Sequence, residues 1–191
     1  MPVSSDTRTR MIEATVEALR CRGVAGMSFT EVLRDSGAAR GAIYHHFPGG
    51  KAQLVAEAAT RYGHDVCAHL AELPAESPQH TVEAFLAAVR SVVQESACGG
   101  GCAVAAVTVS TDADDDTLRQ VAATAFASWV DQLAERLTTS GLPHGDAADL
   151  ATTLITLLQG AHVLCRAAGT IEPFDQVART AIELVRSRCH D

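Results

Sequence analysis

Apolar residues recur along this chain with the spacing of an α-helix rather than that of a β-strand. Near the N-terminus, Ile12, Val16 and Leu19 lie at i, i+4 and i+7, on one face of a helix. The same period recurs throughout, and the alternation typical of strands is almost absent. The sequence therefore predicts an all-α protein of about nine helices. We expect them at about 7–22, 29–36, 39–47, 51–72, 79–95, 103–110, 115–139, 146–167 and 174–189.

The first fifty residues carry the signals of a helix-turn-helix. Gly23 stands where a first helix should end, at the position that glycine commonly takes after a helix. Ser28 and Glu31 have the spacing of a capping box, which predicts the start of a second helix. Gly37 then supplies a tight turn before a short third helix. This organisation predicts a three-helix head at 1–50 and a helical body at 51–191.

The short third helix has a polar side that suits DNA. Ile43 and Phe47 share one side and belong to the core of the head, while Gly41 and His45 lie on the opposite side. An exposed glycine inside a helix costs roughly 0.8–1 kcal/mol relative to alanine, so we expect that a DNA groove approaches the backbone at Gly41. The alternative is that the pattern arises by chance on a solvated helix edge.

Three further side chains around this helix could contact DNA. Arg40 lies in the expected first turn, where its guanidinium can reach a phosphate or a guanine edge. Tyr44 can donate its hydroxyl to a phosphate while its ring packs inward. Lys51, the only lysine, begins the next helix, where its ammonium and the unpaired backbone N–H groups can share one phosphate.

The stretch "MSFTEVLRDSGAARGAIYHHFPGGKAQLV" resembles the DNA-binding signature of the TetR family of bacterial transcriptional regulators. The resemblance runs from about Thr7 to Val55. Ala39 departs from it, because the family usually has Ser or Thr there to cap the recognition helix. Gly49-Gly50 lengthens the link before the lysine by one residue, as in a subgroup that includes the multidrug-responsive LmrA-like and YxaF-like regulators. The segment "GGGCAVAAV" at 99–107 is similar to the body of that subgroup.

The resemblance implies a ligand-responsive regulator, most simply a repressor that leaves its operator when a small, largely hydrophobic molecule binds the body. The DNA contacts that we expect are Thr30, Arg40, Gly41, Tyr44, His45 and Lys51. Arg8 or Arg10 could add contacts from the N-terminus. One head makes too few base contacts to select a site, so a homodimer on a palindrome of double-stranded DNA is expected.

The charge distribution supports this assignment. The net charge is −8, but residues 1–63 hold eight Arg and Lys against six Asp and Glu, whereas the rest hold seven against seventeen. A mildly basic head on an acidic body indicates that a polyanion would contact the head.

The body offers candidates for an effector site and for a dimer interface. Scarce aromatic residues and a few polar ones are the effector candidates, although each could be plain core: Tyr62, Phe85, Phe126, Trp129, Gln159, His162 and Cys165. Apolar stripes mark the last two helices, which pair with their copies in the family that the chain resembles; the alternative is the interior of a monomer. The expected interface is Leu150, Leu154, Leu157, Leu158, Phe174, Val177, Ala181 and Leu184.

The remaining chemistry is sparse. Cys98 and Cys102 are spaced for a metal or a redox disulfide, which makes a thiol-sensing regulator one alternative. A helical small-molecule-binding protein without a DNA role is the other.

No hydrolase elbow, zinc-protease motif or phosphate loop occurs, so we expect no enzyme, no cofactor and no metal. Without a signal peptide or an 18-residue apolar run, we expect a cytoplasmic protein with reduced thiols. The acidic run at 112–116 suits a helix start better than a calcium loop.

Overall fold

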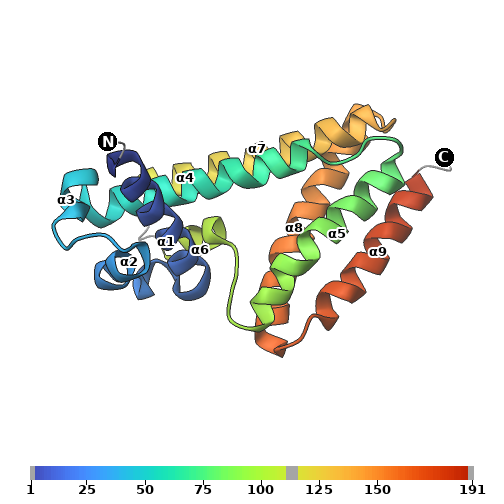
Figure 1. Ribbon diagram of the computed structural model, residues 1–191. Coiled ribbons are helices and arrows are strands. Elements are labelled where there is room, and N and C mark those ends of the chain that lie inside the picture. Colours follow the sequence, from blue (N-terminus) through green and yellow to red (C-terminus); the bar gives the residue numbers. More distant parts are fainter. Residues whose placement is uncertain (1–2, 111–115, 189–191) are drawn as a thin grey trace. The chain divides into compact units, whose positions relative to one another are not determined.

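The structure, a computed structural model, describes residues 3–110 and 116–188 (Figure 1). In these two ranges all regular elements are α-helices, which agrees with the all-α prediction. The helices are α1 (Val3–Gly26), α2 (Phe29–Ser36), α3 (Ala42–His46), α4 (Gly50–Ala71), α5 (Pro78–Ala97), α6 (Ala103–Ser110), α7 (Asp116–Thr139), α8 (His144–Ala168) and α9 (Glu172–Arg188). The predicted helix start at 115, the predicted end at 189 and most of the acidic run at 112–116 lie outside the described residues.

The chain divides into two compact units that differ from the predicted division at residue 50. The first unit consists of Met1–His64 and Cys102–Ala125, and the second of Asp65–Gly101 and Phe126–Asp191. The difference arises because α6 packs against α1. Ala103 and Val107 of α6 and Leu118 of α7 are core residues of the first unit.

The turns of the helix-turn-helix depend on two left-handed glycines. The regular turns of α1 break at Gly23, which has φ 69° and ψ −179°. Gly37 follows α2 with φ 66° and ψ 22°, and its N–H donates to carbonyl groups in the last turn of α2. Both glycines stand where the sequence predicts a helix end, and both have a backbone conformation that favours glycine.

The predicted capping box at the start of α2 is wrong. Ser28 does take the N-cap position with an extended backbone, but its side chain makes no capping hydrogen bond. Glu31 instead forms an ion pair with Arg22 of α1, with 3.5 Å between the carboxylate Oε2 and the guanidinium Nε. The glutamate side chain is therefore used to join two helices rather than to cap one.

The recognition helix α3 is shorter than predicted. It begins at Ala42 rather than at 39, so Arg40 lies in the preceding turn and Gly41 is the N-cap residue, with φ −79° and ψ −9°. The expectation that Gly41 costs stability inside a helix is therefore wrong, although Gly41 is exposed. Ile43 and Phe47 are 1% and 0% exposed, as expected for the core side of α3.

The second unit is built mainly from α5, α8 and α9, each of which packs against the other two. Their shared core includes Phe85, Leu150, Leu154 and Phe174, all of them buried. Among the described residues, α8 is the one helix long and apolar enough to cross a membrane by length and composition. Its place in this core accounts for part of this apolar character, because 39% of the apolar window is buried.

Candidate DNA-binding interface

The exposed side of α2 and α3 forms an open hollow of about 610 Å³. It is lined by Phe29, Thr30, Leu33, Arg34, Ala38, Arg40, Ile43 and Tyr44. The ring of Tyr44 is held edge-on to that of Phe29, with centroids 6.2 Å apart, yet Tyr44 remains 67% exposed. The structure thus brings Thr30, Arg40 and Tyr44, three of the predicted DNA contacts, to one surface.

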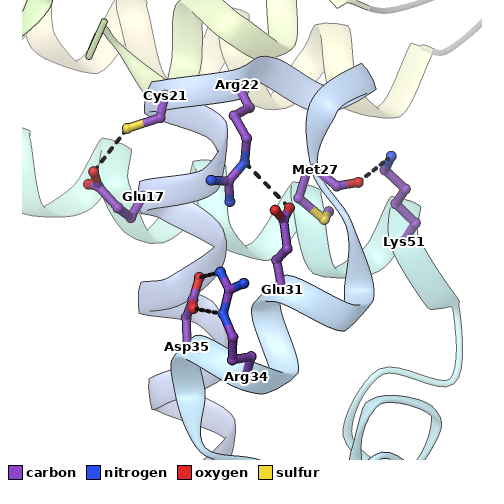
Figure 2. A network of polar contacts seen from close by, with 8 residues as sticks. All are labelled: Glu17, Cys21, Arg22, Met27, Glu31, Arg34, Asp35 and Lys51. Atoms are coloured by element: carbon purple, nitrogen blue, oxygen red, sulfur yellow. Dashed lines mark hydrogen bonds and ion pairs between the residues drawn. The ribbon is translucent and has the colours of Figure 1, made fainter. Parts of the chain in front are cut away.

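Arg34 lines the same hollow and was missed by the sequence analysis. Its guanidinium donates to both carboxylate oxygens of Asp35, with 2.7 Å from Nε to Oδ1 and 3.3 Å from Nη2 to Oδ2 (Figure 2). This hydrogen bond lowers the pKa of Asp35 below its ordinary value. Because residues at i and i+1 on a helix do not normally face each other, no local pattern indicated the pair.

The other predicted contacts are also on the first unit. Gly41 and His45 are exposed, and the His45 ring lies 4.9 Å from that of His46. The ammonium of Lys51 donates to the carbonyl of Met27 over 3.0 Å, which ties the start of α4 to the loop before α2 (Figure 2). An ammonium has three N–H donors, so this bond leaves capacity for a phosphate.

The two N-terminal arginines differ in their environment. Arg8 forms an ion pair with Glu57 of α4, and its guanidinium carbon lies 5.0 Å from the centroid of the Phe47 ring. Arg10 is exposed and donates to the hydroxyl of Thr7 over 3.3 Å. Arg8 thus binds residues of its own chain, next to Phe47 at the end of the recognition helix.

A thiol of the first unit donates a hydrogen bond to an acidic neighbour. The Cys21 Sγ donates to the Glu17 carboxylate over 3.0 Å (Figure 2). This hydrogen bond, together with burial, raises the pKa of the Cys21 thiol above its ordinary value. Because the thiolate is the reactive form, Cys21 lacks the environment of a sensing cysteine.

The other thiols of the described residues are separated by their environments. Cys98 is exposed and Cys102 is buried. The sulfur of Cys102 accepts a hydrogen bond from the Ala105 N–H over 3.4 Å, in the manner of an N-cap for α6. Within the described ranges, no group of three or more His, Cys, Asp or Glu side chains is arranged to hold a metal ion.

The predicted effector residues fall in different places. Tyr62 belongs to the first unit, and the other six belong to the second. Phe126 and Trp129 stack edge-on at 5.1 Å, and Trp129 and Cys165 are buried. Phe85 lines a small apolar cavity of about 10 Å³ between α5, α8 and α9.

Polar atoms are buried in the second unit beside this apolar core. The Ser96 hydroxyl and the His162 Nδ1 share a buried hydrogen bond of 2.7 Å, which joins α5 to α8. The side-chain amide of Gln159 has both its oxygen and its nitrogen buried, with no hydrogen-bond partner among the described residues. Gln159 and His162 are three residues apart, and so lie on one side of α8.

The residues predicted for the dimer interface divide into two sets. Leu150, Leu154, Phe174 and Ala181 are buried within the single chain. Leu157, Leu158, Val177 and Leu184 are only partly buried. The apolar surface left exposed on α8 instead includes Val163 and Leu164, which are 68% and 54% exposed.

An arginine- and tyrosine-lined surface on a helix-turn-helix defines a DNA-binding protein, and comparisons with known proteins agree. Residues 11–58 match the family described as bacterial regulatory proteins, tetR family, and residues 78–180 match the LmrA/YxaF-like transcriptional regulator C-terminal domain. An HTH-type transcriptional regulator of Mycobacterium tuberculosis is 34% identical over 177 residues, which cover 90% of each chain. The regulator LmrA of Bacillus subtilis is 23% identical, covering 95% of this chain and 97% of LmrA.

Solved structures show the same fold. A TetR regulator from Chloroflexus aurantiacus superposes with a TM-score of 0.81 at 22% identity, covering 98% of both chains. One from Legionella pneumophila has a TM-score of 0.80 at 17% identity, covering 92% of this chain and 95% of that one. The chain belongs to the TetR family of transcriptional regulators, with a body of the LmrA/YxaF-like type, and it is a regulator rather than an enzyme.

Proposed function

We propose that the protein is a homodimeric cytoplasmic repressor that binds a palindromic operator and releases it when a small, largely hydrophobic molecule binds the second unit. The hollow lined by Thr30, Arg34, Arg40 and Tyr44 is the observation that carries this proposal. A guanidinium can form two hydrogen bonds with a guanine edge in the major groove, and hydroxyl groups can bind the flanking phosphates.

Two heads are needed because one short helix reads too few base pairs. We place the dimer contact on the exposed side of α8. Thr156, Gly160 and Val163 lie at i, i+4 and i+7 on that helix, with Leu164 beside them. A Cβ atom at Gly160 would meet nothing within 4 Å, so the chain's own packing does not require a glycine there. Small side chains along an exposed apolar face let a second helix approach closely.

We assign the effector to the side of α8 that carries Gln159 and His162. The cavity lined by Phe85 is about 10 Å³, which is barely enough for one water molecule, so it holds no effector in this conformation. An unpaired buried amide, by contrast, costs about 1–3 kcal/mol unless a ligand supplies the missing hydrogen bonds. An apolar molecule with one donor and one acceptor would satisfy it.

Helix α4 is the element through which we expect the effector to act. Its residues before Asp65 belong to the first unit and the remainder belong to the second. A rotation of α4 would therefore move residues of both units. A coupling of roughly 1–3 kcal/mol between effector and operator would weaken DNA binding about 5–150-fold.

The proposal is tested by selecting binding sites from a random-sequence duplex library with the purified protein. We expect enrichment of one palindrome, and loss of that enrichment with Tyr44→Ala. Arg40→Ala should weaken binding to the selected site by about 5–150-fold, the value of one good base contact. Arg179→Ala, which removes an exposed arginine from α9, is the charge-matched control and should bind normally.

Transcription from a promoter that overlaps the palindrome should fall when the wild-type protein is added. Enrichment of sequences without two-fold symmetry would contradict the dimeric operator. Equal enrichment by the wild type and by Tyr44→Ala would contradict the assignment of the interface. Melting temperatures of the variants should match that of the wild type, which separates lost contacts from lost folding.

A further inference from the structure

The turn from Phe47 to Gly50, which leads from the end of α3 into α4, is the part of the head that carries the additional glycine. The Gly50 N–H donates to the Phe47 carbonyl over 2.9 Å, which closes the turn. Gly50 has φ 66°, a conformation that disfavours other residues. Phe47, at the other end, is fully buried. This turn sets the direction of α4 relative to the recognition helix.

One side chain of α4 reaches back to hold the turn. The Gly49 N–H donates to the Gln53 Oε1 over 2.8 Å. A Cβ atom at Gly49 would lie 3.0 Å from the Gln53 Cβ and 3.0 Å from its Oε1, so the side chain lies directly against the glycine. The absence of a side chain at residue 49 is therefore what allows this contact.

The contact between Gly49 and Gln53 is part of a closed cycle of interactions. The Gln53 Nε2 donates to the Glu57 Oε1 over 2.9 Å, and the other oxygen of Glu57 accepts from Arg8 of α1. The Arg8 guanidinium in turn lies over the Phe47 ring, at 5.0 Å from its centroid. This cycle of contacts thus returns to Phe47, at which the turn begins, and it joins α1 and α4 to the C-cap residue of α3.

We propose that Arg8, Gln53 and Glu57 are positioning residues for DNA binding, which fix the recognition helix against α4 without touching DNA. Arg8 would otherwise be counted as a DNA contact because it is a cation near the N-terminus. Since Gln53 and Glu57 stand on α4, a rotation of that helix moves the turn through them. This second role rests on the proposed effector mechanism, whereas the positioning of α3 rests on DNA binding alone.

The direction in which one substitution changes DNA affinity distinguishes positioning from simple electrostatics. Glu57→Gln removes a negative charge from the head, which by charge alone would strengthen DNA binding. Positioning predicts the opposite: a loss of roughly tenfold in affinity for the palindrome selected by the wild type, typical of coupled contacting residues. Binding to a scrambled duplex should change little, so the ratio of the two affinities should fall.

Glu13→Gln is the matched control, because it makes the same charge change at an exposed position of α1. Arg8→Met should lower the affinity ratio like Glu57→Gln, and the double variant should lose less than the sum of the two. Arg8→Lys, which keeps the cation, should restore most of the ratio.

Three outcomes would overturn the proposal. Glu57→Gln could behave like Glu13→Gln, which would show that this cycle of contacts does not position α3. It could strengthen binding and steepen the salt dependence, which would identify Arg8 as a DNA contact masked by Glu57. The melting temperature of Glu57→Gln could fall while its affinity ratio stays constant, which would show that the cycle of contacts contributes to stability alone. Failure of the wild type to select a palindrome would instead count against the operator proposed above.

Discussion

At the scale of single residues, Gln159 is the side chain whose environment calls for an explanation. Both polar atoms of its amide are buried without a partner among the described residues. We therefore expect Gln159→Met, which keeps the length of the side chain but removes the amide, to stabilise the protein without effector. The gain should be about 1–3 kcal/mol. For a chain of this size that corresponds to a rise in melting temperature of roughly 2–12 °C.

The measurement is thermal unfolding, monitored by circular dichroism. Gln94→Met is the matched control: Gln94 is exposed on α5, so its replacement should leave the melting temperature nearly unchanged. A fall in the melting temperature of Gln159→Met would mean that the amide stabilises the fold, and the assignment of the effector site to this side of α8 would lose its support.

Sequence patterns placed residues on a common surface where local chemistry decides the outcome. Thr30, Arg40 and Tyr44 line one surface because the helix-turn-helix signals fix their placement, and their contacts with DNA stay predictions. Arg34 was missed because its place in the hollow depends on how α2 packs beside α3. Glu31 was misassigned because its partner, Arg22, is on another helix, and a local capping pattern cannot reveal a long-range ion pair.

At the scale of elements, the left-handed conformation of Gly50 predicts how much stability a side chain at this position would cost. Gly50→Ala places a Cβ atom at φ 66°, although nothing lies within 4 Å of that atom. The cost should therefore be backbone strain alone, about 1–2 kcal/mol, measured as lost free energy of unfolding in urea. Gly41→Ala is the control, because Gly41 has φ −79° and equally open surroundings. An equal loss in both variants would contradict the role of backbone strain.

Helix bounds in the body followed the sequence closely, because glycine, proline and acidic residues separate long periodic segments. The start of α3 did not, because the residues at 39–41 are compatible with a helix and only the tight turn after Gly37 keeps them out of it. Periodicity marked an apolar stripe on α8 that we expected at a dimer interface, but Leu150 and Leu154 of that stripe are buried within the single chain. It could not tell which apolar residues face the interior of one chain and which remain exposed, since both repeat with the same period.

At the scale of the whole molecule, the proposed dimer can be tested through the exposed side of α8. Val163→Glu would bury an unpaired charge in that contact, at a cost of several kcal/mol. We expect the dissociation constant of the dimer to rise on the order of 100-fold, measured by size-exclusion chromatography with light scattering. Val109→Glu makes the same change at a valine of the first unit that is 85% exposed, and should leave the dimer intact. An intact dimer in both variants would move the interface away from Val163.

The division of the chain has a practical consequence for building hybrid regulators. The first unit is discontinuous in sequence, since α6 and the beginning of α7 supply Ala103, Val107 and Leu118 to its core. A transplant of residues 1–50 would leave this core incomplete and would separate Arg8 from Gln53 and Glu57. A head that is to keep its operator preference on a foreign body must therefore travel as two segments, Met1–His64 together with Cys102–Ala125.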